Sequence, residues 1–334
     1  GKKSLGLDLK TEEGLAILHK LIATSDVFLT NKLPNVREKL KIGVDEVRAH
    51  NPNIIYVRGT GQGERGPDAD KGSYDSLAFW ARAGIAQGAK RPEYDSVPMP
   101  PAPGFGDSIG GMTIAGGIMG ALYHREKTGE ATTVDVSLFG VGLWAMGQAM
   151  ALSLVLDLPW SAPPAGGGGN PLTRNYKASD GELAFTCLQA AKYWPTLCAV
   201  LDRPELATDE RFADNESLLA NSLDAIAILD EIFAGGTVDE WRERLEPWDG
   251  QWTVVQTTLQ AAIDPQAIAN GYIQDCVNAS GTPFQMVAAP VQYDEEAPKP
   301  GRAPEFNEHG DELLAELGYD WDTVVDLKVK GVVA

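Results

Sequence analysis

The chain has 334 residues, 43% hydrophobic and 22% charged, a balance typical of a folded protein with about two domains. Its formal net charge of −19 at pH 7 disfavours nucleic acid and anionic membranes as partners. Cys187, Cys198 and Cys276 have no CxxC spacing, so neither a disulfide framework nor a zinc site is predicted. The longest apolar stretch, 141–156, is too short and too interrupted to span a bilayer, and we expect a soluble cytoplasmic protein.

The first third of the chain alternates helical and extended patterns. Residues 11–23 carry an apolar stripe at helical spacing, with Thr11 as the expected N-cap. The apolar runs 26–29 and 53–57 predict buried strands, and short helices are expected at 36–40 and 44–49. Strands that alternate with helices favour βαβ units and a parallel sheet.

The middle of the chain reads as mostly helical from Asp75 onward. Residues 108–125 contain five glycines, which a helix tolerates where another backbone or a ligand approaches closely, so we expect this helix to be buried. Residues 132–138 alternate like a strand, and one long helix is predicted from there to about 156.

A Pro/Gly-rich segment at 159–175 is the clearest candidate for a linker or a functional loop. Beyond it we expect a second module with a hairpin near Asp180-Gly181 and helices such as the one capped by Thr237. A proline-rich link then leads to a final helix at 310–317.

A dozen short motifs, taken in order and with their spacing, resemble the class III CoA-transferases, the CaiB/BaiF family that includes formyl-CoA transferase. The resemblance covers nearly the whole chain. The motifs that carry it include Asp26-Val27, Asn51-Pro52, Gly61-Gln62-Gly63, Tyr74-Asp75, Gly106-Asp107-Ser108, Arg125 to Gly129, Val134 to Leu138, Asn170-Pro171 and Ser179 to Gly181.

The resemblance implies an α/β fold, with a large Rossmann-like CoA-binding domain, a smaller α+β domain and an interlocked homodimer. We expect the large domain at 1–160, a glycine-rich linker or flap at 161–175, the small domain at 176–290, and a return linker with a C-terminal segment on the large domain at 291–334. The family opens with a strand–helix–strand segment that is absent before Lys3, so we expect a piece to be missing here.

Asp107 is the expected catalytic residue. From the residues alone, a carboxylate at a predicted helix start is most simply an N-cap. The resemblance instead makes Asp107 the nucleophile, which would form an acyl-aspartyl anhydride and then an aspartyl-CoA thioester. Backbone N–H groups of 106–110 are the expected oxyanion donors.

Tyr74 and Asp75 complete the expected catalytic set. Asp75 alone reads as a solvated helix start, whereas the resemblance makes it a carboxylate that positions the substrate. In the racemases of the family the position of Tyr74 holds a histidine that exchanges an α-proton. A phenol is poorly suited to that exchange near neutral pH, so Tyr74 favours a transferase.

The tetraglycine run Gly166, Gly167, Gly168 and Gly169 has two interpretations. Four glycines between prolines form a flexible linker. The resemblance favours a mobile flap that excludes water from the reactive intermediates.

Contacts to CoA are also implied by the resemblance, although lone surface lysines are more often simply solvated. Leu33 stands where the family often has an arginine, so part of the phosphate contact is expected to differ. The implied CoA-binding residues are Leu7, Lys10, Asn31, Lys32, Lys39, Gly61, Gln62, Gly63, Lys71, Gly72 and Ser73.

The expected enzyme therefore moves coenzyme A from an acyl-CoA to a carboxylic acid without a metal. Two alternatives remain open: an acyl-CoA racemase or isomerase of the same fold, and a catalytically silent CoA-binding protein.

Overall fold

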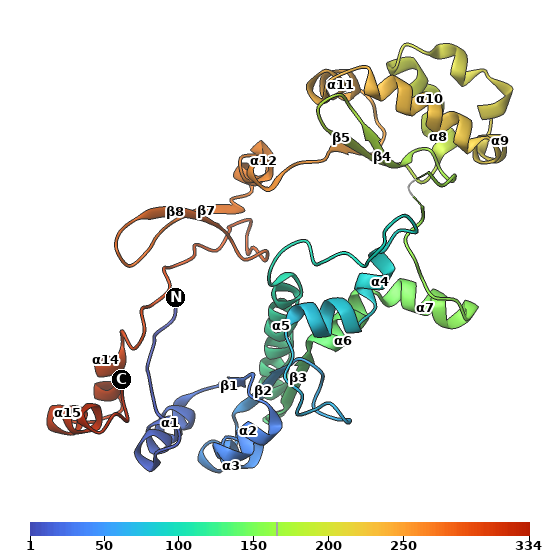
Figure 1. Ribbon diagram of the computed structural model, residues 1–334. Helices are drawn as coiled ribbons and strands as arrows, with labels where there is room; N and C mark the ends of the chain where they lie inside the picture. Colours follow the sequence, from blue (N-terminus) through green and yellow to red (C-terminus); the bar gives the residue numbers. More distant parts are fainter. Residues whose placement is uncertain (165) are drawn as a thin grey trace. The chain divides into compact units, whose positions relative to one another are not determined.

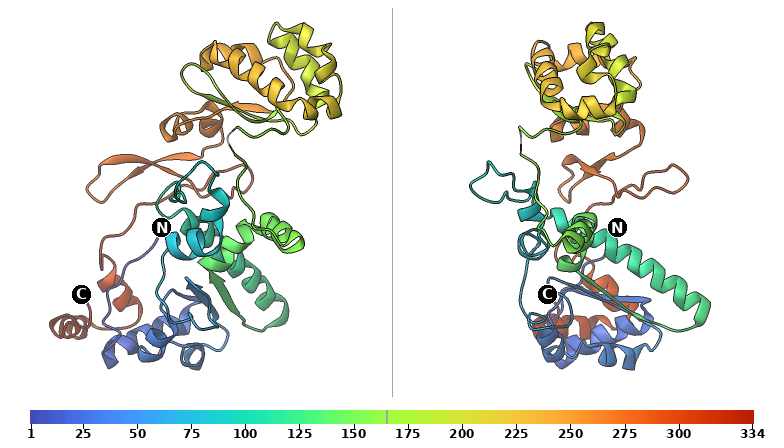
Figure 2. Two further views of the ribbon diagram at one scale, coloured as in Figure 1. Left: turned by 45° about the vertical axis from the view of Figure 1, so that its right-hand side comes forward. Right: turned by 90° about the vertical axis from the view of Figure 1, so that its right-hand side faces the viewer.

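The computed structural model describes residues 1–334 except Ala165. The chain divides into two compact units, drawn in Figures 1 and 2. The first unit comprises Gly1–Pro163, Val277–Thr282 and Gly301–Ala334, and the second comprises Pro164–Cys276 and Pro283–Pro300.

A three-stranded parallel sheet in the order β1-β2-β3 forms the centre of the first unit. Its strands are β1 (Val27–Thr30), β2 (Ile55–Thr60) and β3 (Thr133–Ser137). Val27 pairs with Ile55, and Tyr56 pairs with Thr133. The mixed α/β fold and the parallel pairing predicted from the sequence are confirmed.

Helices cover both faces of this sheet. Successive side chains of β2 point to opposite sides, so neighbouring residues of this strand pack against different helices. Tyr56 packs with Ile22 of α1 (Glu12–Thr24) and Val47 of α3 (Val44–His50), whereas Val57 packs with Ala121 of α5 (Phe105–Thr128). The short helix α2 (Pro34–Lys39) precedes α3. The predicted cap of α1 is confirmed, since the Thr11 hydroxyl accepts a hydrogen bond from the Gly14 N–H.

Helix α5 differs from its prediction in two respects. It begins at Phe105, with Gly104 as N-cap at φ 69°, so Asp107 lies inside the first turn and is not the N-cap. It is also not a buried helix: Gly110 is buried, but Gly111, Gly116 and Gly120 are exposed, and a Cβ at any of these three would meet open space. These exposed glycines do not share one face of α5, because Gly111 and Gly120 are nine residues, or two and a half turns, apart.

The expected long helix that ends near residue 156 is in fact two helices, α6 (Leu138–Ala145) and α7 (Gly147–Leu156), bent by 72°. Before them, the π-helix η1 (Ser76–Arg82) and α4 (Ile85–Ala89) pack on α6. Gly142 permits this contact, because an added Cβ would lie 2.5 Å from Ala83 Cβ and 2.7 Å from Phe79 O.

Within the described residues no single helix has the length and apolarity to span a membrane, although the bent α6–α7 pair has both.

The two ends of the chain meet in the first unit. Leu7 forms a β-bridge with Val333, and Ile17 of α1 shares a small core with Leu314 and Leu327. These leucines belong to α14 (Gly310–Glu316) and α15 (Trp321–Val329). Helix α14 was expected to be the last, and α15 corrects that expectation.

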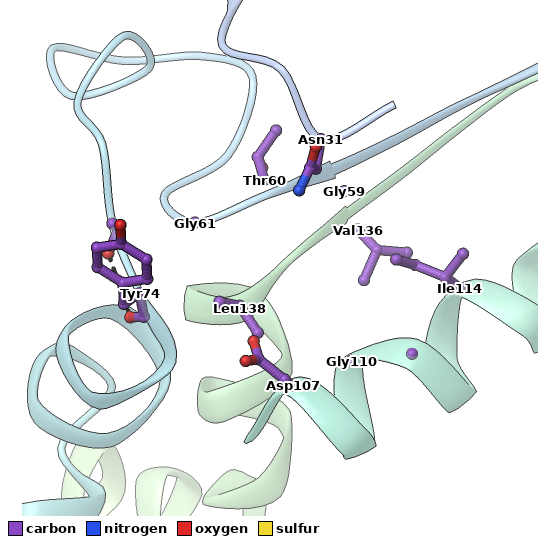
Figure 3. Close-up of a pocket in the computed structure, with 12 residues that line it drawn as sticks. Asn31, Gly59, Thr60, Gly61, Tyr74, Asp107, Gly110, Ile114, Val136 and Leu138 are labelled. Carbon is purple, nitrogen blue, oxygen red and sulfur yellow. Dashed lines mark hydrogen bonds between the residues drawn. The ribbon is translucent and has the colours of Figure 1, made fainter. Parts of the chain in front are cut away.

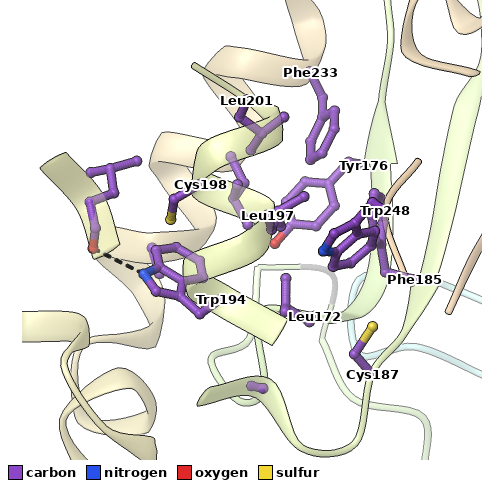
Figure 4. Packing of buried hydrophobic residues seen from close by; sticks show 14 of the residues in the cluster. Leu172, Tyr176, Phe185, Cys187, Trp194, Leu197, Cys198, Leu201, Phe233 and Trp248 are labelled. Atoms are coloured by element: carbon purple, nitrogen blue, oxygen red, sulfur yellow. Dashed lines mark hydrogen bonds between the residues drawn. The ribbon is translucent and has the colours of Figure 1, made fainter. Parts of the chain in front are cut away.

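The second unit has an antiparallel sheet of β4 (Thr173–Lys177), β5 (Glu182–Thr186) and β6 (Trp252–Val254). Helices α8 (Ala190–Val200), α9 (Asn215–Ala220), α10 (Ser222–Ala234) and α11 (Val238–Leu245) pack with the sheet around an aromatic core that includes Trp194, Phe233 and Trp248 (Figure 4). The hairpin at Asp180-Gly181 and the capping box of Thr237 are both confirmed.

Two short 3₁₀ turns (Pro204–Ala207 and Glu210–Phe212) connect α8 to α9. After β6 follow the short helices α12 (Thr258–Ala262) and α13 (Pro265–Ala269) and the two-stranded hairpin of β7 (Ile273–Val277) and β8 (Pro283–Val287).

Cys187, Cys198 and Cys276 are free and buried, and burial raises the pKa of the Cys198 thiol to about 12. These thiols are structural.

Candidate active site

A cavity of about 350 Å³ opens where the three parallel strands of the first unit end (Figure 3). Asn31 follows β1, Gly59 to Gly61 end β2, and Val136 and Leu138 flank the end of β3. Ligand sites in open parallel sheets lie outside the carboxyl ends of the strands, so the topology itself places a site here. The remaining lining residues are Ser73, Tyr74, Asp107, Gly110, Gly111 and Ile114.

The carboxylate of Asp107 reaches this cavity from the first turn of α5 (Figure 3). Its side chain is exposed, which an electrophile needs in order to approach it. The positive end of the α5 dipole lies at this turn. Asp107 is thus an accessible carboxylate in a cavity with several backbone walls.

Asp75 fixes the helix turn that carries Asp107. Its side chain is 7% exposed, and its two oxygens each lie 3.1 Å from the Gly106 nitrogen, whose N–H they accept. A side chain on Gly106 would overlap the Phe79 ring and the Asp75 carboxylate, so only glycine fits at that position. The backbone directly before Asp107 is therefore held by a buried charged acceptor.

A second cavity, of about 390 Å³, shares Tyr74 and Asp107 with the first. It is also lined by Asp75, Ser76 and Gly104. The rest of its lining is apolar and comes from one loop, through Met99, Pro100, Ala102 and Pro103. Asp107 and Tyr74 therefore stand where a polar, glycine-rich cavity meets an apolar one.

The structure brings some of the expected CoA-binding residues to the first cavity. Asn31, Gly61 and Ser73 line it, and so do the expected catalytic residues Tyr74 and Asp107. The Gln62 amide instead donates to Ser73 Oγ at 3.0 Å and accepts from Arg82 at 2.7 Å, so this side chain braces the loop. The described linings of the two cavities do not include Leu7, Lys10, Lys32, Lys39, Gly63, Lys71 or Gly72.

Two of the expected oxyanion donors are already engaged. The Gly106 N–H is held by Asp75, and the Ser108 N–H donates to Gly104 O at 2.9 Å. These two N–H groups are therefore not available to a substrate, and the expectation for the rest of residues 106–110 stays a prediction. The Asn31 amide and the Tyr74 hydroxyl remain as donor groups on the cavity wall.

A chain of charged side chains holds the loop that follows β2. Glu64 accepts from Arg37 at 2.5 and 3.0 Å and lies 3.1 Å from Arg58, which also pairs with Asp135 at 2.5 Å. The Asp135 carboxylate raises the pKa of the Arg58 guanidinium. Arg37, 6% exposed, and Arg58 line a smaller cavity of about 200 Å³ beside α2.

The expected flap Gly166–Gly169 belongs to the second unit and follows Ala165, which lies outside the described residues. The Gly167 N–H donates to Pro164 O, and the Gly169 N–H donates to the Ser222 hydroxyl at 3.2 Å.

Among the described residues no group of three or more His, Cys, Asp or Glu side chains gathers as a metal site would require.

Several lining residues were not foreseen from the sequence. Gly59, Thr60, Val136 and Leu138 line the first cavity because they stand at strand ends, and the predicted parallel sheet was a signal that would have identified them. The proline-rich loop that includes Met99 carried no such signal, since only its tertiary contacts bring it to Asp107.

Comparisons with known proteins agree with this arrangement. A family model described as CoA-transferase family III matches residues 1–310. The chain is 31% identical to the (R)-2-hydroxy-4-methylpentanoate CoA-transferase of Clostridioides difficile, with 99% of this chain and 83% of that protein aligned. It is 30% identical to the cinnamoyl-CoA:phenyllactate CoA-transferase of Clostridium sporogenes, over 98% of this chain and 80% of that protein. A solved CaiB/BaiF family structure from Brucella suis matches with a TM-score of 0.79 at 28% identity, covering 95% and 82% of the two chains.

Proposed function

The chain belongs to CoA-transferase family III, and from this premise we propose that it moves CoA from an acyl-CoA to a free carboxylic acid by covalent catalysis at Asp107. Similar proteins bear the names of CoA-transferases that act on acyl-CoAs and acids. The observation that supports Asp107 most directly is its exposed carboxylate at the junction of the two cavities.

The proposed reaction begins when an Asp107 oxygen attacks the thioester carbonyl of the donor and the C–S bond breaks. The products are an acyl-aspartyl anhydride and CoA thiolate. The thiolate then attacks the aspartyl carbonyl, which releases the donor acid as its carboxylate and leaves an aspartyl-CoA thioester. The acceptor carboxylate repeats the two steps in reverse, so that a new acyl-CoA leaves and Asp107 is regenerated.

We assign the first cavity to the thiol end of CoA, because its glycine walls admit a chain close to Asp107. The Asn31 amide and the Tyr74 hydroxyl are the proposed donors to the oxyanions. The phosphates are assigned to the lysine-rich N-terminal part of the large domain, through Lys10, Lys32, Lys39 and Lys71 together with Leu7 and Gly72. The flap role of Gly166–Gly169 and the cytoplasmic location stay predictions.

The test of the proposal is Asp107→Asn, which keeps the shape of the side chain but removes the nucleophile. We expect transfer to fall at least about 10³-fold while binding of CoA changes little. Tyr74→Phe is the comparison and is expected to lower kcat by about 100-fold, less than Asp107→Asn, because it removes one of the two proposed oxyanion donors and leaves the nucleophile in place.

Trapping during turnover gives a direct readout. Hydroxylamine added with an acyl-CoA should modify the Asp107 peptide, which mass spectrometry would detect. Labelling at Asp75 in its place, or substantial transfer by Asp107→Asn, would contradict the mechanism. Exchange of solvent deuterium into the α-position of an acyl-CoA, without transfer, would instead establish the isomerase alternative.

A further inference from the structure

The second cavity has a composition that bears on the acid that the enzyme accepts. Four of its lining residues, Met99, Pro100, Ala102 and Pro103, are apolar. Its polar lining consists of Tyr74, Ser76 and two carboxylates, Asp75 and Asp107. Among the residues that the structure describes, none that lines this cavity carries a positive charge.

The apolar wall is stiff and anchored. Residues 96–104 read SVPMPPAPG, and their four prolines restrict the backbone before any ligand arrives. The indole N–H of Trp80, a buried residue of η1, donates to Pro98 O at 2.7 Å and ties the loop to the core. A preformed apolar wall of this kind suits an apolar chain, since little ordering is needed when the chain binds.

Two cations on the elements that frame this cavity have other partners. Arg82 of η1 is paired with Asp68 at 2.6 Å and donates to Gln62, and Lys90, at the start of the loop, donates to Asp95 O at 3.5 Å. A second carboxylate on the acyl chain would lie beside Asp75 and Asp107 and meet no cation in the described lining of the cavity.

Resting on the transferase function proposed above, we propose that the second cavity holds the acyl chain and selects uncharged, apolar monocarboxylic acids against dicarboxylic acids. Met99 and Ala102 are the specificity-determining positions, because both line the cavity and both are exposed, so that a charge placed there would face the acyl chain.

The test compares pentanoyl-CoA with glutaryl-CoA as CoA donors for the 334-residue protein, because these acyl groups have the same number of carbons and differ by one terminal carboxylate. We expect kcat/KM to favour pentanoyl-CoA by at least about 100-fold. Equal rates, or a preference for glutaryl-CoA, would overturn this inference and leave the transferase function standing. If no acyl-CoA is turned over with any acid, the transferase function itself fails, and the inference with it.

A matched pair of lysine variants locates the effect. Met99→Lys puts a cation in the cavity. It should raise kcat/KM for glutaryl-CoA and so lower the ratio of kcat/KM for pentanoyl-CoA to that for glutaryl-CoA at least about tenfold. Val97→Lys, two residues away on the same loop and outside the described lining, adds the same charge to the same segment and should leave the ratio unchanged. Ala102→Lys repeats the test if Met99→Lys is poorly folded. Equal shifts in the Val97 and Met99 variants, or no shift in either cavity variant, would contradict the assignment of the acyl chain to this cavity.

Discussion

At the scale of single residues, the position of Asp107 depends on the contact between Asp75 and Gly106. The Asp75 carboxylate is buried, faces the Gly106 N–H and sits at the positive end of the α5 dipole. Because Gly106 directly precedes Asp107, any movement of this turn moves the nucleophile. We therefore propose that Asp75, which also lines the second cavity, acts chiefly by positioning Asp107.

This distinction predicts how Asp75→Asn behaves. A small displacement of a nucleophile lowers the rate of the chemical step without weakening binding, so we expect kcat to fall about 10- to 100-fold with KM for acyl-CoA changed less than about threefold. Steady-state kinetics at saturating acceptor measures both. A large rise in KM with kcat preserved would show that Asp75 holds the substrate instead.

The matched control is Asp320→Asn. Asp320 caps α15 by accepting from the Thr323 N–H at 2.8 Å, so this variant also removes the charge of a carboxylate at a helix start. It should change stability little, because Asn caps a helix about as well as Asp, and it should leave kcat unchanged. A fall in kcat in both variants would indicate a general loss of folded protein.

At the scale of elements, the loop after β2 forms part of the first cavity through Gly61 and is held by Glu64 between Arg37 and Arg58. Two arginines share one carboxylate, and Arg37 is nearly buried. Removing the shared anion takes the carboxylate partner from the nearly buried Arg37, while Arg58 keeps Asp135, and this is more damaging than deleting an exposed ion pair.

Glu64→Gln is therefore expected to lower the free energy of unfolding by about 3 kcal/mol and to raise KM for acyl-CoA as the cavity wall loosens. Urea unfolding and steady-state kinetics measure the two effects. Glu130→Gln, an exposed change of the same kind, should shift stability by less than about 0.5 kcal/mol. Stability equal to the wild type in Glu64→Gln would show that the network contributes little.

Some of the helices and strands could be predicted from the sequence, and others could not. Helix α1 and the strands β1 and β2 follow from local signals: an apolar stripe, the Thr11 cap and short apolar runs between turns. The bend between α6 and α7 has only a weak local signal, because no proline stands there and Gly147, the first residue of α7, is one of several glycines in this stretch. Helix α15 was missed because its stripe is short and only its contact with Ile17 completes a core.

The residues of the candidate site also fall into two groups, those expected from the sequence and those that only the structure reveals. Asn31, Gly61, Ser73, Tyr74 and Asp107 were all expected from the family resemblance, and all five line one cavity. The apolar wall of the second cavity was not foreseen, because loop residues without charge or regular spacing reveal nothing until a tertiary contact such as Trp80 to Pro98 fixes them.

At the scale of the whole molecule, the first unit exposes more large apolar side chains than a lone folded unit ordinarily leaves in water. Five of them lie on α5, α6 and α7, and we call this set the apolar surface. Its members are Met119, Tyr123, Trp144, Leu154 and Val155, which are 60, 66, 86, 78 and 81% exposed, respectively. Gly116 and Gly120 lie on the same side of α5 as Tyr123, and another backbone can approach the helix at these two positions. A second copy of the chain is the partner we propose for this surface, in the interlocked homodimer expected for the family.

This proposal predicts a particle of twice the 35.8 kDa chain mass by sedimentation at micromolar concentration without detergent. An obligate interface of this kind should bury well over about 2,000 Å² and be largely apolar. The double variant Trp144→Glu/Val155→Glu would bury two unpaired charges there and should give monomers. Trp321→Glu is the control: Trp321 is 64% exposed on α15, outside the apolar surface, and its change should leave the dimer intact. A monomeric wild type would contradict the proposal, and so would a protein that stays in solution only with detergent or lipid, because the bent α6–α7 pair would then have a membrane as its partner.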